Sequence, residues 1–554
     1  MDPIAQAPPQ VHFARTTFDE MLAYHQAHPA VQPTIHPYMK APPPRELPFA
    51  ANRAADTSGV GLDKGATEPG ETETPVPGGP GPMLAAPPLI VNFAGTFDDN
   101  TNIPPDTHGA VGPAHVVNML NTGFQVFDRT GGIVAPQITL QAFWAVLGTG
   151  AGQPAADPYD PKILYDQHSG RWVVVSDSNG FSTATRVLVG ISLTSDPTGA
   201  WNLFAIDPDP GTRWADYPGL GVDAANVYVS NNMFTAAGAF SLARFWVISK
   251  ASMIAGGALD LGVRTPPTGG FAFQPAHSFD NDPGGLNYFV DGDWYIDGTP
   301  LRFVKLTQFT GIGAATVMTE LGFIEVLGYN FYILEAPQSN CATPIATNDT
   351  RIMNAVLRNG KVWATHHVGD GAPIDPADAT KPEVAWYEMD PSAANFLDPS
   401  PPPIQQGHVE HPTLAYYFPS IAVNAVECVA LGFSGSDADT FASAYYTLRD
   451  SIDSPGTMQA VGLLRAGEAS YLKMFTGTRN RWGDYSATMI DPLDDLTFWT
   501  TQEYAEAPFS GGPDCEVDGG RWGLWWGSFQ CTAPPPSPIT EPTVIVKSRF
   551  ISFS

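Results

Sequence analysis

The chain has 554 residues, of which 54 are Gly and 54 are Pro, so about a fifth of it interrupts regular structure, which excludes long helical bundles and coiled coils. Lys and Arg number 27 against 56 Asp and Glu, and the net charge of -29 excludes a nucleic-acid partner, since phosphate binding needs a basic surface. Hydrophobic residues make up 43%, enough for a large core, yet no apolar run reaches the roughly 18 residues that cross a membrane.

The first 88 residues differ from the rest of the chain. They are rich in Pro, Gly, Ala and Thr, and we expect a disordered or extended Pro/Gly-rich arm over residues 1–88. One short helix interrupts it, because Thr17 and Glu20 have the spacing of a capping box. Its apolar face would consist of Phe18, Met21 and Leu22. The opening MDPIAQAPPQ lacks the basic and apolar regions of a signal peptide, so we expect a cytoplasmic protein or a mature form without its leader.

Residues 89–532 consist of short β-rich runs such as RWVVVSDS, NVYVSNN and KVWATHHV, separated by Gly, Asp, Asn or Pro. This pattern predicts one all-β domain, followed by a Pro-rich linker and a terminal strand over residues 533–554.

An internal repeat predicts the architecture of that domain. Three segments align without gaps: DYPGLGVD (216–223), YFPSIAVN (417–424) and DYSATMID (484–491). Looser copies begin at Asp106, Asp160 and Asp349, and a degenerate copy near 273–277 fills the longest interval. Seven units of about four strands are typical of a seven-bladed β-propeller, with six or eight blades as alternatives because the fourth unit rests on spacing. The strand at 89–97 would complete the last sheet, in competition with TVIVKSRFISF near the C-terminus.

Four cysteines are few for this length, and none lies in a C-x-x-C pair that would indicate zinc or redox chemistry. Cys515 and Cys531 flank a predicted hairpin. A disulfide between them in an oxidising compartment and a pair of buried free thiols are both open.

The motifs PPDTHGAVGP, YDQHSGRWVVVS, DYPGLGVD, YYFPSIAVN and RWGDYSATMID, spread over about 100–530, resemble those of a group of uncharacterised secreted bacterial β-propeller proteins. The resemblance implies a propeller fold and an extracellular location. It implies no reaction and no catalytic residues.

In a propeller, the loop before each innermost strand opens onto a central funnel. Asp106, Asp160, Asp216, Asp349 and Asp484 hold equivalent positions there. Three interpretations remain open: turns fixed by carboxylates, a calcium site with Asp106, Asp160 and Asp349 as metal ligands, or catalysis on a glycan. The catalytic candidates are Asp216, Asp484, Tyr217, Tyr485 and His277.

Two Arg-Trp pairs precede funnel aspartates. Arg213 and Trp214 precede Asp216, and Arg481 and Trp482 precede Asp484. Such a pair can stack on a sugar and bind its acidic groups, or the Arg can stack on the Trp between blades. We therefore expect a secreted, monomeric propeller that binds or cleaves a polysaccharide or oligosaccharide, as a hydrolase or lyase. The alternative is a non-catalytic surface, adhesion or binding scaffold stabilised by calcium.

Overall fold

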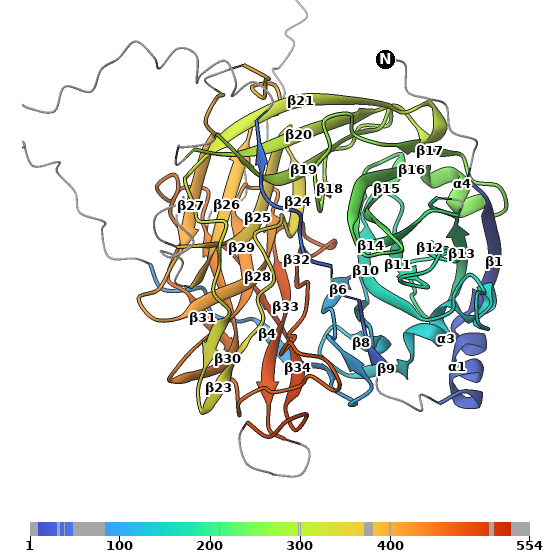
Figure 1. The fold of residues 1–554 in the computed structure, drawn as a ribbon, viewed down its shortest axis with the longest axis horizontal. Coiled ribbons are helices and arrows are strands. Elements are labelled where there is room, and N and C mark those ends of the chain that lie inside the picture. The colour runs from blue at the N-terminus through green and yellow to red at the C-terminus, as the bar shows by residue number, and fades with distance from the viewer. Residues whose placement is uncertain are drawn as a thin grey trace, which may run out of the picture.

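The computed structural model describes residues 9–29, 34–37, 39–47, 84–209, 211–296, 299, 301–370, 381–397, 400–508 and 515–532. Strands dominate these residues, and the helices are few and short (Figure 1). The all-β fold class is confirmed. The linker and terminal strand expected over 533–554, including TVIVKSRFISF, lie outside the described residues.

Most strands follow one another in antiparallel groups of four, and parallel pairing between first strands joins three of these groups into one 13-stranded sheet. The first group consists of β6 (His108–Val111), β7 (His115–Leu120), β8 (Gly123–Asp128) and β9 (Ile133–Ile138). The second consists of β10 (Pro158–Asp166), β11 (Arg171–Ser178), β12 (Arg186–Ser192) and β13 (Ala200–Ile206). The third consists of β14 (Arg213–Val222), β15 (Asn226–Thr235), β16 (Phe240–Ser249) and β17 (Leu261–Arg264). Next come β18 (Gln274–Ser278), β19 (Leu286–Tyr295), β20 (Arg302–Thr310) and β21 (Val317–Val326). The fifth group consists of β24 (Asn354–Arg358), β25 (Lys361–Gly369), β26 (Pro382–Met389) and β27 (Gln405–Val409). The sixth consists of β28 (Ala415–Val423), β29 (Val429–Asp437), β30 (Thr440–Arg449) and β31 (Gly462–Arg465). The last consists of β32 (Ala487–Ile490), β33 (Phe498–Glu506) and β34 (Arg521–Phe529), together with β4 (Val91–Phe97) from the N-terminal side.

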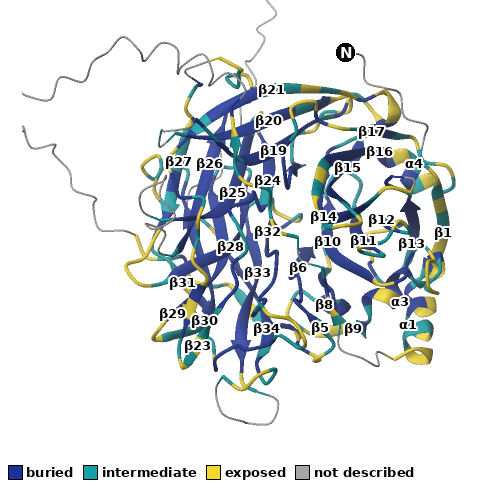
Figure 2. Ribbon diagram, viewed as in Figure 1, coloured by how far each residue is buried: buried dark blue, intermediate teal, exposed yellow. Residues whose placement is uncertain are grey.

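The first strands of the groups, which we call the inner strands, lie around the middle of the molecule (Figure 1). They are β6, β10, β14, β18, β24, β28 and β32. Each contacts the next in this order, and β32 contacts β6. Their residues are mostly buried, whereas exposed residues concentrate in loops and on helix α1 (Figure 2). The arrangement is therefore propeller-like.

The smaller elements attach to these groups. The helices are α1 (Phe18–Ala27), α3 (Leu140–Trp144) and α4 (Lys250–Ala255), with short 3-10 turns η2 (Ala145–Leu147) and η3 (Gly313–Ala315). The remaining strands are β1 (Val11–Thr17), β2 (Thr34–Ile35), β3 (Arg45–Glu46), β5 (Asn102–Ile103), β22 (Ala336–Gln338) and β23 (Cys341–Ile345).

The described parts of the N-terminal arm are extended strands and the one short helix, and they pack against the larger sheets. Strand β1 pairs with β13 along its whole length and forms the outer edge of that group. Helix α1 begins at the predicted capping box, in which the Thr17 side chain accepts from the amide of Glu20 and the Glu20 carboxylate accepts from the amide of Thr17. Phe18 and Met21 are buried in the core, as predicted.

Strand β4 closes the last group. Residues 91–97 pair antiparallel with β34, so a strand from the N-terminal side completes a sheet made by the C-terminal residues. This confirms the prediction for residues 89–97, and the pairing removes an exposed sheet edge.

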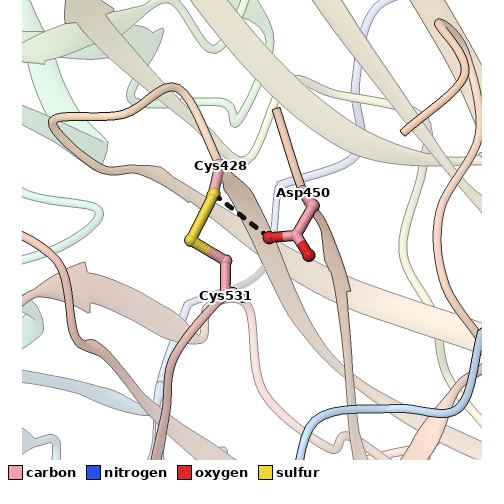
Figure 3. A group of neighbouring side chains, drawn as sticks. All are labelled: Cys428, Asp450 and Cys531. Atoms are coloured by element: carbon pink, nitrogen blue, oxygen red, sulfur yellow. Dashed lines mark hydrogen bonds between the residues drawn. A yellow bond between two sulfur atoms is a disulfide. The ribbon is translucent and has the colours of Figure 1, made fainter. Parts of the chain in front are cut away.

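Two disulfides connect the described cysteines, Cys341 with Cys515 and Cys428 with Cys531. Neither alternative for Cys515 and Cys531 holds, because each forms a disulfide with a cysteine more than 100 residues earlier. Asp450 lies beside the second disulfide (Figure 3). Its carboxylate also accepts from the amide of Thr532. Both sulfur atoms are bonded to each other, so this group does not offer thiolate ligands to a metal.

Candidate functional site

Bulges in two inner strands lie at predicted site residues. The pairing of β10 with β11 shifts after Tyr159, and that of β14 with β15 shifts after Asp216. At these places Asp160 and Tyr217 adopt positive φ angles of 52° and 58°. A bulge of this kind bends the strand and changes the direction of a side chain, which explains how a repeated motif presents polar groups inside the molecule.

Three of the predicted aspartates meet in one hydrogen-bonded network. The Oδ1 atom of Asp106 accepts from the backbone amide of Asp484 at 2.9 Å. Its Oδ2 atom accepts from the side-chain nitrogen of Asn121 at 2.6 Å. The side-chain oxygen of Asn121 in turn accepts from the backbone amide of Asp160 at 2.9 Å. The Asp106 carboxylate and the Asn121 side chain thus tie together the loops that precede β6 and β32 and the bulge of β10.

Arg481 neutralises this network. It donates to both carboxylate oxygens of Asp484, at 3.1 and 3.0 Å, and it is 5% exposed. A buried guanidinium bonded to a carboxylate through two hydrogen bonds is a strong and directional pair. Arg481 was predicted to bind a ligand with Trp482, but its charge is directed at the protein's own acidic groups.

Asp349 belongs to a second ion pair. Arg351 donates to both oxygens of this carboxylate, at 2.6 and 2.5 Å. Burial alone would raise the pKa of Asp349, but the charge and hydrogen bonds of Arg351 outweigh it, so the pKa is lowered. The structure therefore brings Asp106 and Asp160 together but engages Asp349 elsewhere. Among the described residues, the only group of three or more His, Cys, Asp or Glu side chains close enough together to hold a metal ion is Cys428, Asp450 and Cys531.

The two predicted catalytic tyrosines face a lysine. The rings of Tyr217 and Tyr485 have centroids 5.1 Å apart. The Nζ atom of Lys162 lies 4.1 Å from the ring centroid of Tyr485 and donates to Gln274 at 3.1 Å. Burial lowers the pKa of Lys162 to about 7 and raises that of both tyrosines well above 10. Each tyrosine is thus a neutral donor at physiological pH.

Burial dominates the acid–base behaviour of the aspartates. It raises the pKa of Asp160 to about 6, with the negative charge of Asp484 adding to the effect. Burial and the neighbouring carboxylates raise the pKa of Asp106 and of Asp216 well above its usual value. One carboxylate oxygen each of Asp160 and Asp216 is buried without a hydrogen-bond partner among the described residues. These groups are costly to ionise together.

This cost predicts a pH-dependent effect of Asp160→Asn. A folded-state pKa of about 6 against 3.8 means that the folded state holds the proton more tightly, so wild-type stability falls as pH rises from about 4 through 6. The asparagine variant escapes that loss and still offers an oxygen to the hydroxyl of Tyr485. Relative to wild type, we expect it to gain about 1.4 kcal/mol between pH 5 and pH 8, measured by urea denaturation.

Asp494→Asn is the matched control for this experiment. The hydrogen bonds of Thr497 outweigh burial and lower the pKa of Asp494, so it is ionised at both pH values. The control should differ from wild type by the same amount at pH 5 and pH 8. Equal shifts for the two variants would contradict the assignment of a raised pKa to Asp160.

His277 lies apart from these aspartates. One ring nitrogen bonds to the Gln167 side chain at 3.0 Å, and the ring stacks on Phe279. Burial lowers its pKa to about 3, so the imidazole is neutral. His277 lines a cavity of about 60 Å³ together with His108, Lys162, Gln274 and Tyr485. That volume suits a few water molecules and is far below the roughly 300 Å³ of ordinary ligand pockets.

The other Arg-Trp residues also bond within the protein. Arg213 pairs with Asp209 at 2.5 Å and with Ser241, away from Arg481. The indole nitrogen of Trp214 donates to the carbonyl of Thr235, and that of Trp482 donates to Ser434. Both indoles are 1% exposed, so neither offers a face to a sugar in this conformation.

Lys162, Arg351 and Asn121 complete the site and were not predicted. The sequence holds a signal for the first two, because each stands two residues after a repeat aspartate, in DPK and in DTR. Side chains two apart on a strand point to the same face. Asn121 follows β7 and has no such regularity.

Comparisons with known proteins add distant similarities only. No protein-family model and no curated protein matches the sequence. Among solved structures, the lignostilbene dioxygenase of Pseudomonas brassicacearum is 10% identical with a TM-score of 0.37, over 67% of this chain and 75% of that chain. Extracellular domains 1-2 of Drosophila Semaphorin 1a are 10% identical with a TM-score of 0.36, over 80% of this chain and 88% of that one. A mutant of Synechocystis apocarotenoid oxygenase is 11% identical with a TM-score of 0.36, over 64% and 74% of the two chains. Scores this low carry no argument about function.

Within the described residues, no helix has the length and apolar character needed to cross a membrane.

Proposed function

We propose that the protein is a secreted, monomeric seven-bladed β-propeller that acts as a non-catalytic binding scaffold. The seven antiparallel groups, the cyclic contacts of their inner strands and the completion of the last group by β4 support the blade count. Two disulfides support an oxidising, extracellular setting, in agreement with the resemblance to secreted propellers.

One observation carries the non-catalytic role. Asp106, Asp160, Asp216, Asp484, Arg351, Arg481 and both tyrosines are buried, and each of the two arginines pairs with a carboxylate. Of these residues only Tyr485 lines the cavity of about 60 Å³. These contacts join the loops of different groups, as expected for residues that hold a ring of sheets together. Calcium binding by Asp106, Asp160 and Asp349 stays a proposal, for which chelator should lower the melting temperature and added calcium restore it.

Action on a polysaccharide is the second candidate. It is favoured by the pair Asp160 and Asp484, in which the pKa of Asp160 is raised by burial and by the negative charge of its partner. Glycosidases use a carboxylic acid with a raised pKa together with a second carboxyl group. A sugar chain would have to enter from the side on which these residues lie.

A screen for reducing ends released from acidic and neutral polysaccharides separates the two candidates. For a scaffold we expect no release by wild type, and none by Asp216→Asn or Asp484→Asn. Release by wild type that both folded variants lose would contradict the scaffold role and support hydrolysis.

A further inference from the structure

Residues 34–47 cross the molecule as an extended segment, which we call the strap; Tyr38 within it is outside the described residues. One end is held by β2, which pairs in parallel with β5. The other is held by β3, which pairs in parallel with the end of β19, and by the amide of Leu47, which donates to the carbonyl of Tyr295 at 2.9 Å. The strap therefore spans from the segment before β6 to the group that contains β19.

Between these ends, the strap lies against the two buried arginines of the site. Arg481 donates to the carbonyls of His36 and Pro37, at 2.9 and 3.0 Å. Arg351 approaches the carbonyl of Met39 at 3.5 Å. Each guanidinium is thus shared between a funnel carboxylate and the strap backbone, as in recognition of an extended peptide. Backbone carbonyls give such contacts without requiring one particular side chain.

Aromatic side chains form the floor beneath the middle of the strap. Met39 and Ala41 pack against a cluster that contains Trp214, Tyr217 and Tyr485. The other members of this cluster are Tyr159, Phe234, Phe271 and Ala272, with Phe240 packed against it. Further along, the guanidinium of Arg45 lies 5.6 Å from the ring centroids of both Phe240 and Trp294. We call this aromatic floor the groove; Arg45 of the strap lies over two aromatic rings near one end of it.

The composition of the strap matches that groove. It contains Pro37, Pro42, Pro43 and Pro44, which restrict the chain to extended or polyproline conformations and reduce the entropy lost on docking. It carries Lys40 and Arg45 against one acidic residue, Glu46, in a chain of net charge -29. The positive charge of Arg45 acts against the burial that raises the pKa of Asp291 and Asp293. Charge and backbone shape are both complementary to the site.

We propose that this aromatic groove is a binding site for extended, proline-rich, basic polypeptide segments, and that the strap is its resident occupant. The inference rests on the proposed role as a binding scaffold and names its ligand class. Because the strap is tethered at both ends, its effective concentration at the groove is high, on the order of millimolar for a short tether. A free peptide of the same sequence is then excluded from the wild-type protein.

The test uses the full chain and a fluorescent peptide with the sequence of residues 34–47. The double variant Met39→Asp with Ala41→Asp places charges against the aromatic floor and weakens the strap in place. We expect the peptide to bind this variant at least about tenfold more tightly than wild type, measured by fluorescence anisotropy, which corresponds to about 1.4 kcal/mol. A peptide that carries the same two aspartates is the matched control and should not bind.

Two further variants locate the peptide and guard against misfolding. Adding Phe240→Ala to the double variant removes part of the groove and should reverse the gain. Arg45→Glu, at a half-buried position, loosens the strap with less disturbance to the core and should give at least about a threefold gain. Circular dichroism and melting curves identify the folded variants.

Equal binding of the peptide to wild type and to the folded variants, binding to none of them, or equal binding of the control peptide would overturn the proposal. Failure of this inference differs from failure of the scaffold role. Sugar release in the screen above rejects the scaffold whatever the peptide does, whereas no release together with no peptide binding rejects only the ligand class.

Discussion

Replacing Arg481 with methionine is expected to lower the free energy of unfolding by about 3 to 5 kcal/mol, because it removes the positive partner of a buried carboxylate. Arg481 is bonded to Asp484, and its charge also acts on Asp106 and Asp160. The variant leaves these acidic groups close together at low exposure and removes two hydrogen bonds to the strap. Urea denaturation followed by tryptophan fluorescence measures the change.

Arg213→Met is the matched control, since Arg213 occupies the equivalent place in the sequence repeat. Its side chain is 31% exposed and pairs with Asp209, which is 11% exposed. An ion pair this accessible contributes about 0 to 1 kcal/mol. Similar losses for the two variants would show that Arg481 does not neutralise a buried acidic network.

Removing either disulfide is expected to cost about 4 to 5 kcal/mol. Cys428 and Cys531 are separated by 103 residues, and Cys341 and Cys515 by 174. Cross-links across such long loops strongly restrict the unfolded chain, and the longer loop should cost about 0.5 kcal/mol more to lose. The double variants Cys428→Ser with Cys531→Ser, and Cys341→Ser with Cys515→Ser, should therefore melt well below wild type.

The control for the disulfide experiment is a count of free thiols in the denatured, unreduced protein. We expect none in wild type and none in either double variant, because each retains the other complete pair. Thiols in wild type, or a reducing agent that leaves the melting temperature unchanged, would contradict the pairing.

Six of the inner strands could be predicted because they carry close or loose copies of one motif, and β18 only because the spacing left room for a further unit. The positions of Asp106, Asp160 and Asp484 follow from that motif. The cysteine pairing could not, since four cysteines allow three connectivities and spacing favours none. Strand β1 was missed because its partner β13 lies nearly 190 residues away and no repeat unit includes it. The strap gave no signal either, because its contacts with Arg481 and Arg351 use backbone carbonyls, which no side-chain pattern records.

The site residues were predicted by type and position but not by environment. A motif such as RWGDY states that an arginine, a tryptophan and an aspartate are near one another. It does not state whether the guanidinium faces solvent or a carboxylate. Arg213 and Arg481 stand in matching RWxDY motifs but differ in environment. Arg213 pairs with Asp209 near the surface, whereas Arg481 is buried beneath the strap and pairs with Asp484.

The pairing of β4 with β34 also sets a constraint on biosynthesis. The amide of Val91 bonds to the side chain of Ser528, 437 residues later. At 5 to 20 residues per second, a ribosome needs on the order of 20 to 90 s to make the intervening chain. During that time β4 has no partner, and the apolar residues of the last group have no finished sheet to join. Nascent chains that stop before β34 therefore leave two unpaired strand edges, which makes them targets for chaperones and proteases, and the last sheet is completed only after β34 has left the ribosome.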